Sequence, residues 1–188
     1  MHAPRWLDPG GQVPVLAAVP EPQPAESDLL IWGAHGGAGT STLSVLLRPA
    51  RDMGALRTEA DYRYSVPNPQ QYPVLVACRC TTWSAIKASK AVTALTRGGG
   101  QVSVLAVVSD GWPEPPIATA WFRLLSAQVG AVVRVPFIPW LRLSNDPALV
   151  RLPRTARQAL ATIRSITRTY PDFGGGHDAA AHSDPESA

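Results

Sequence analysis

Lysine is scarce in this sequence: Lys87 and Lys90 are the only two in 188 residues, and arginine supplies the remaining basic charge. Cysteine is equally scarce, because Cys78 and Cys80 are the only two and no CxxC pair is present. This excludes a disulfide framework and the common zinc motifs. No apolar run approaches the about 20 residues of a membrane span, and no secretion-type apolar segment opens the chain. These absences predict a cytoplasmic protein without a membrane span.

The overall charge is weakly basic, with a formal net charge of +3 and 16% charged residues. That balance does not by itself indicate nucleic-acid binding. Arginines nevertheless recur along the C-terminal segment, at Arg142, Arg151, Arg154, Arg157, Arg164 and Arg168. A solvated helix face is the favoured interpretation, and a basic patch for nucleic acid or an acidic partner is the alternative.

The length and composition predict one folded domain between two extensions. Residues 1–27 are rich in proline and alanine without periodicity, and residues 171–188 are small and polar. We expect both extensions to be disordered. Residues 28–170 carry the apolar patterns of a folded core.

Short apolar runs alternate with helical patterns across this domain. The runs are Leu29–Trp32, Val74–Cys78, Val102–Val108 and Ala131–Val135, and the helices are expected over Thr42–Arg48, Trp83–Arg97, Ile117–Val129 and Pro153–Tyr170. The second and third runs are almost continuously apolar, which is typical of strands covered on both faces. The alternation predicts a compact three-layer α/β domain with a mainly parallel sheet of about four strands. Residues 49–73 are irregular and are expected to form a loop with at most one short helix.

The most distinctive segment is Leu29–Leu47, where an apolar run leads into a glycine-rich turn and then into a helical pattern. This order is that of a P-loop, whose backbone N–H groups surround a phosphate. The pattern G-x-x-x-x-G-K-[ST] places Gly39 at its second glycine and Ser41 at its Mg²⁺-binding hydroxyl, but Thr40 stands at the lysine position. The alternative is a turn without a ligand, in which Thr40 and Ser41 only cap the helix.

The turn Gly36-Gly37-Ala38-Gly39 and the residues around it resemble the deviant loop K-G-G-x-G-K-[ST]-[ST] of the ParA/MinD class of P-loop ATPases. His35 stands in place of the first lysine, which in that class reaches a partner's nucleotide, and Thr40 in place of the second. Three later segments are similar to the class in order and approximate spacing: Val74–Ala91, Leu105–Asp110 and Val132–Trp140. The resemblance implies a P-loop-NTPase-like fold, ATP or another nucleotide with Mg²⁺, and a protein partner or homodimer.

The departures from the class predict a degenerate and truncated member. The class has two further strands and its catalytic acids between the loop helix and the segment that Val74 begins, where this chain has only residues 49–73. ATP hydrolysis is not expected, because phosphoryl transfer relies on positioning and charge that the missing lysines and acids supply. The implied function is a nucleotide-binding pseudo-ATPase that acts through interactions in DNA partition, conjugation or intracellular positioning.

The implied nucleotide site combines the loop with two later segments. Its expected contacts are His35, Gly36, Gly37, Ala38, Gly39, Thr40, Ser41, Thr42, Asp110, Pro136 and Phe137. Pro136 and Phe137 are expected to flank the base, and protonated His35 to replace a lysine in part. Asp110 ends an apolar run as a Walker B acid does. If that strand lies beside Leu29–Trp32, Asp110 and Ser41 are expected to hold Mg²⁺.

Two other functions stay open. One is an active small P-loop NTPase or kinase that uses Ser41 and Asp110, and the other is an interaction scaffold that no longer binds nucleotide. A dinucleotide fingerprint is weakly supported, because Thr42 stands where its third glycine belongs. A G-x-S-x-G elbow is excluded, because Leu43 replaces the final glycine.

Overall fold

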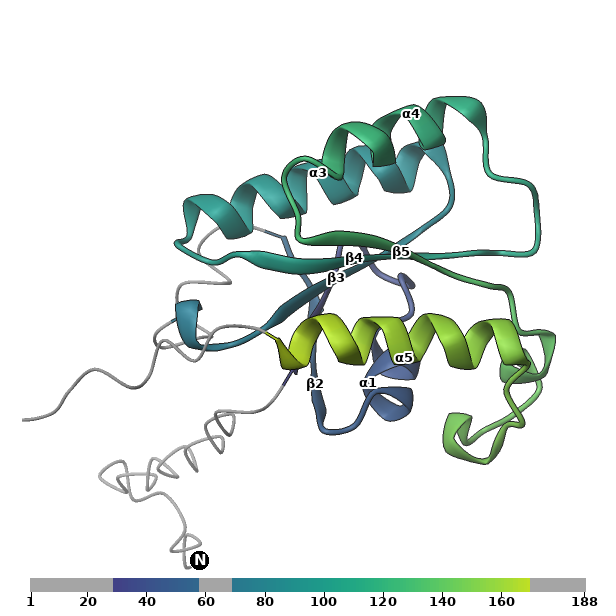
Figure 1. Cartoon of the computed structure of the whole chain (residues 1–188). Helices are drawn as coiled ribbons and strands as arrows, with labels where there is room; N and C mark the ends of the chain where they lie inside the picture. Colours follow the sequence, from purple (N-terminus) through teal and green to yellow (C-terminus); the bar gives the residue numbers. More distant parts are fainter. Residues whose placement is uncertain (1–28, 58–68, 170–188) are drawn as a thin grey trace, which may run out of the picture.

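The computed structural model describes residues 29–57 and 69–169, which form an α/β domain around a parallel sheet (Figure 1). The sheet has five strands in the order β2-β1-β3-β4-β5. The strands are β1 (Leu29–Gly33), β2 (Ala50–Ala55), β3 (Val74–Arg79), β4 (Val102–Val108) and β5 (Ala131–Val135). The α-helices are α1 (Thr40–Leu46), α3 (Thr82–Arg97), α4 (Pro116–Leu125) and α5 (Arg154–Arg168). Short 3-10 turns are η1 (Pro69–Gln71), η2 (Pro139–Arg142) and η3 (Pro147–Leu149).

Helices cover both faces of the sheet, as Figure 1 shows: α3 and α4 lie on one face, and α1 and α5 on the other. Each face has its own apolar core. Phe122 of α4 packs with Val76 of β3 on the first face, whereas Ile163 of α5 packs with Leu75 on the second. Neighbouring residues of β3 therefore point into different cores, which explains why this strand is apolar at almost every position. The predicted α/β class and parallel sheet are confirmed.

The sheet has one strand more than the runs predict, and the expectation of a loop over residues 49–73 is wrong, because β2 lies there. Strand β2 pairs in parallel with β1, with Leu29 opposite Ala50 and Ile31 opposite Asp52. It forms an edge of the sheet and its residues are half-buried or exposed. The sequence ARDMGA therefore lacks the apolar run that identifies the central strands.

The order of the strands creates a switch point between β1 and β3. The chain runs from β1 to β2 on one side of β1, and then returns to β3 on the other side. The loops that leave β1 and β3 therefore diverge at the carboxyl edge of the sheet. In open α/β sheets, ligands bind in the crevice at such a point.

Several expectations fall on residues outside the described ranges. These are the predicted disorder of residues 1–27 and 171–188 and the middle of the irregular segment at residues 58–68. Within residues 29–57 and 69–169, no helix has both the length and the apolar character that a membrane crossing requires.

Candidate functional site

The glycine loop that leaves β1 lies at the switch point. The Ala34 N–H donates to the carbonyl of Ala77 in β3 at 2.9 Å, so the loop starts tied to the neighbouring strand. Gly37 and Gly39 have φ values of 78° and 99°, which favour glycine over any residue with a side chain. A Cβ built on Gly36 or Gly37 meets no heavy atom within 4 Å. The outer face of the loop backbone is therefore open.

Helix α1 follows the loop directly, and Gly39 is its N-cap residue without a side-chain cap. The expectation that Thr40 and Ser41 cap this helix is therefore wrong. Thr40 begins the helix, and the first N–H groups of a helix have no partner within it.

Ser41 bonds to an acid that the sequence patterns did not single out. Its Oγ donates to Asp52 Oδ2 at 2.6 Å, while the Gly54 N–H donates to Asp52 Oδ1 at 2.9 Å. Asp52 lies on β2, whose residues form no apolar run, so the sequence pattern gives no signal for this acid.

Asp110 occupies a different part of the carboxyl edge. The pairing of Asp110 with Ser41 required β4 to lie beside β1, but β3 lies between them, so this premise is wrong. Asp110 Oδ1 accepts from the Trp112 N–H at 3.1 Å and from the Cys80 thiol at 3.3 Å. The first of these bonds is the main reason why the pKa of Asp110 lies below its usual value. Among the described residues, no group of three His, Cys, Asp or Glu side chains is placed to hold a metal ion.

His35 is fixed within the loop by two hydrogen bonds. Its Nδ1 lies 2.8 Å from the carbonyl oxygen of Gly36, and its Nε2 lies 2.6 Å from Ser84 Oγ. A carbonyl only accepts, so Nδ1 carries the proton and the Ser84 hydroxyl donates to Nε2 in the neutral ring. Ser84 is fully buried and also accepts from the Arg79 N–H at 2.7 Å. Ser84 therefore orients His35 and has no exposed surface from which to attack a substrate.

Arg79 ends β3 and joins that strand to the glycine loop. Its Nε donates to the carbonyl oxygen of Gly37 at 3.0 Å. The interaction links residues 42 positions apart in the chain. No local sequence motif indicates this hydrogen bond, because its two residues are far apart in the chain. Arg79 is nevertheless the last residue of a central strand.

Pro136 and Phe137, the expected base contacts, have different surroundings. Pro136 lines a cavity of about 310 Å³ at the ends of β4 and β5, which also includes Cys80 and Trp112. Phe137 instead packs against Gly111, where an added Cβ would lie 3.1 Å from its ring, and the Arg142 guanidinium lies 4.8 Å from the ring centroid.

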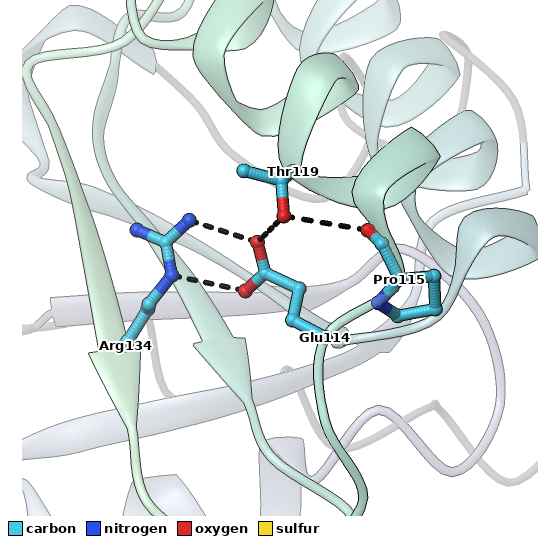
Figure 2. A network of polar contacts seen from close by, with 4 residues as sticks. All are labelled: Glu114, Pro115, Thr119 and Arg134. Carbon is cyan, nitrogen blue, oxygen red and sulfur yellow. Dashed lines mark hydrogen bonds and ion pairs between the residues drawn. The ribbon is translucent and has the colours of Figure 1, made fainter.

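The same cavity is bordered by a charged network that ties the start of α4 to β5 (Figure 2). Arg134 donates from Nε and from one terminal nitrogen to the two carboxylate oxygens of Glu114, each at 2.9 Å, and Thr119 Oγ1 donates to Glu114 at 2.7 Å. The bonds from Arg134 are the main cause of the lowered pKa of Glu114. This network stabilises a turn at the carboxyl edge of the sheet.

Both cysteines are thiols in the first apolar core. Burial raises the pKa of Cys78 to about 12 and also raises that of Cys80. They are therefore poor nucleophiles at neutral pH.

A second cavity, of about 430 Å³, adjoins the glycine loop itself. It lies between the loop, the end of β2 and helix α3, and its lining includes His35, Gly36, Arg57, Trp83, Lys87 and Lys90. Its size is in the usual range for small-molecule sites, about 300–1,000 Å³.

Comparison of the chain with models of protein families, with curated proteins and with solved structures found no match. The resemblance to the ParA/MinD class accordingly stays a prediction based on the glycine loop.

Proposed function

We propose that the protein binds a nucleoside phosphate at the loop after β1 and does not hydrolyse it. The supporting observation is the position and form of the glycine loop. It leaves β1 at the switch point of a parallel sheet, holds Gly37 and Gly39 in left-handed conformations, and leaves its outer backbone face open. Backbone N–H groups that meet at such a loop are suited to phosphate oxygens.

The oxygen atoms beside the loop fit a Mg²⁺ ion that accompanies the phosphates. Ser41 and Asp52 offer a hydroxyl and a carboxylate whose oxygens are 2.6 Å apart. Mg²⁺ takes oxygen ligands and usually keeps several waters, so one carboxylate together with substrate phosphates suffices. A bound Mg²⁺ would neutralise part of the phosphate charge, and Ser41 with Asp52 would hold it at the start of α1.

The charges next to the loop favour retention of the ligand over its hydrolysis. The loop contains no lysine, and β3, the strand beside β1, ends in Arg79, which is a cation and not an acid. The guanidinium of Arg79 is bonded to the loop carbonyl of Gly37. Phosphoryl transfer depends on fixed charges at the transferring group, and these residues supply few of them.

A thermal-shift panel with ATP, ADP and GTP, each with and without Mg²⁺, tests the proposal. A ligand at one hundred times its Kd stabilises the folded state by about 2.7 kcal/mol. For a chain of this size that corresponds to a rise in melting temperature of about 5 °C or more. A phosphate-release assay on the same samples should show no turnover. If no nucleotide shifts the transition, the scaffold alternative replaces this proposal.

The glycine loop itself is tested by Gly37→Ala, with Gly99→Ala as the matched control. Both positions have positive φ, 78° and 88°, so both substitutions strain the backbone in the same way. Gly99 follows the end of α3, away from the carboxyl edge of the sheet. We expect both variants to lose about 1–2 kcal/mol of stability but only Gly37→Ala to lose the nucleotide-induced shift. Equal shifts in the two variants would count against the loop.

We also propose that the protein acts through a protein partner or as a homodimer, as the resemblance to the ParA/MinD class implies. A bound nucleotide can change association if it binds the associated and the free protein with different affinities. Light scattering with and without the nucleotide that gives the largest thermal shift measures whether the chain associates with itself. An unchanged mass would leave a different protein as the expected partner.

A further inference from the structure

The cavity beside the glycine loop collects basic side chains from three separate parts of the chain. His35 comes from the loop, Arg57 from the segment that follows β2, and Lys87 and Lys90 from α3. No acidic side chain is among the described residues that line it. The two lysines are also the only lysines of the whole sequence.

The lysines share one stripe of helix α3 with an aromatic side chain. Trp83, Lys87 and Lys90 are spaced by four and three residues, so they lie on the same side of the helix. Trp83 is 57% exposed at the mouth of the cavity. Lys87 is half-buried and Lys90 is exposed. Within the part of the chain that the structure describes, neither lysine makes an ion pair, so both ammonium groups are available to a ligand.

Contacts around Trp83 hold the cavity wall in place before any ligand arrives. The Lys87 ammonium lies 5.2 Å from the centroid of the Trp83 ring. The His35 ring packs against the same indole with a centroid separation of 4.8 Å, and its two nitrogens are bonded to Gly36 and Ser84. The loop and α3 are therefore joined through Trp83 and Ser84. Groups that are already ordered lose less conformational entropy when they bind.

We propose that Lys87 and Lys90 bind the polyphosphate chain of the ligand in this cavity and so replace the lysines that the glycine loop lacks. Ala34, His35 and Gly36 from the start of the loop line the same cavity, so phosphates bound in it would lie between the loop and these two lysines. Two ammonium groups one helical turn apart match a ligand with two or more neighbouring anionic groups better than a single phosphate. This inference rests on the proposed function for the loop, but the polyphosphate can come from a nucleotide or from an inorganic polyphosphate.

Calorimetric titration with ATP and with inorganic tripolyphosphate, each with Mg²⁺, tests the inference. The test variant is Lys87→Gln/Lys90→Gln. Its matched control is Arg154→Gln/Arg157→Gln, which removes two exposed basic residues at the same spacing from α5, on the opposite face of the sheet. We expect the lysine variant to raise Kd for both ligands by about 10- to 100-fold and the control to change it by less than about twofold. Lys87→Arg/Lys90→Arg should restore most of the affinity, because it restores the charge.

The outcomes separate this inference from the proposed function. If the wild-type protein binds ATP and the lysine variant binds it equally well, the inference is overturned and nucleotide binding stands. If tripolyphosphate binds in a lysine-dependent manner while ATP does not bind, the inference holds and the nucleotide proposal fails. If neither ligand binds the wild-type protein, both are overturned. Circular dichroism of each variant confirms that these surface substitutions leave the fold intact.

Discussion

Two buried serines should respond differently to the same substitution. Ser84 Oγ lies 2.7 Å from the Arg79 N–H and 2.6 Å from His35 Nε2. Ser103 on β4 is 7% exposed, and its Oγ has no hydrogen-bond partner in the described part of the chain. Ser84→Ala removes a hydroxyl that has two hydrogen-bond partners. Ser103→Ala removes a buried hydroxyl that has no hydrogen-bond partner in the described part of the chain.

The expected magnitudes follow from these contacts. Loss of the Ser84 hydroxyl leaves the part-buried Arg79 N–H without this acceptor, which costs about 1–3 kcal/mol. The better helix propensity of alanine offsets about 0.5 kcal/mol of that. We therefore expect Ser84→Ala to lower the free energy of unfolding by about 1–2 kcal/mol. Ser103→Ala should leave it unchanged or raise it by about 1 kcal/mol, because an unpartnered hydroxyl no longer has to be buried.

Urea unfolding followed by tryptophan fluorescence measures both effects, and a constant m value shows that only stability has changed. A second readout is the nitrogen spectrum of His35. With the Ser84 hydroxyl absent, Nε2 loses its donor, and we expect the population of the Nδ1–H tautomer to fall only in Ser84→Ala. Equal losses of stability in the two variants, or a greater loss in Ser103→Ala, would refute the hydrogen-bond assignment.

Three further predictions concern the glycine loop, the turn before β5 and the carboxyl edge of the sheet. Gly36→Val should change the unfolding free energy by less than about 0.5 kcal/mol, because an added Cβ has open space, yet calorimetry should show weakened nucleotide binding. Gly130→Ala should destabilise by about 1–3 kcal/mol in urea unfolding, since its Cβ would lie 2.6 Å from the Ser103 carbonyl oxygen. Arg134 holds the pKa of Glu114 below its usual 4.5. The stability that Glu114 contributes is therefore complete above pH 4.5 and is lost as pH falls through the lowered pKa. Glu114→Gln should accordingly be less stable than wild type by about 1 kcal/mol at pH 7, and the difference should shrink towards pH 3.

The central strands could be predicted from the sequence because their burial leaves a direct signature. Val102–Val108 has the bounds that its apolar run predicts, and β1 and β3 begin at the residues where their apolar runs begin. Strand β2 could not be found in this way, because an edge strand with Arg51 and Asp52 half-buried or exposed needs no apolar run. Its existence depends on pairing with β1, which is a tertiary property.

The glycines identify the loop in the sequence, but the sequence does not indicate which charged residues lie beside the loop. A motif search looks for a lysine within a few residues of Gly39. Here the nearest lysines come from α3, about fifty residues later, and Asp52 comes from the missed strand. Parallel strands bring the loops after β1 and β3 to one edge of the sheet, so such residues meet only after folding.

The two acids near the carboxyl edge argue further for binding without hydrolysis. Asp110 has a lowered pKa and holds the Trp112 N–H and the Cys80 thiol on a single oxygen. A weaker base is less able to take a proton from an attacking water. Asp52 uses one oxygen for Ser41 and the other for the Gly54 N–H, so its geometry suits a metal ligand that stays in place. Neither acid is therefore placed to activate water beside the loop, whereas cationic side chains line the cavity next to it.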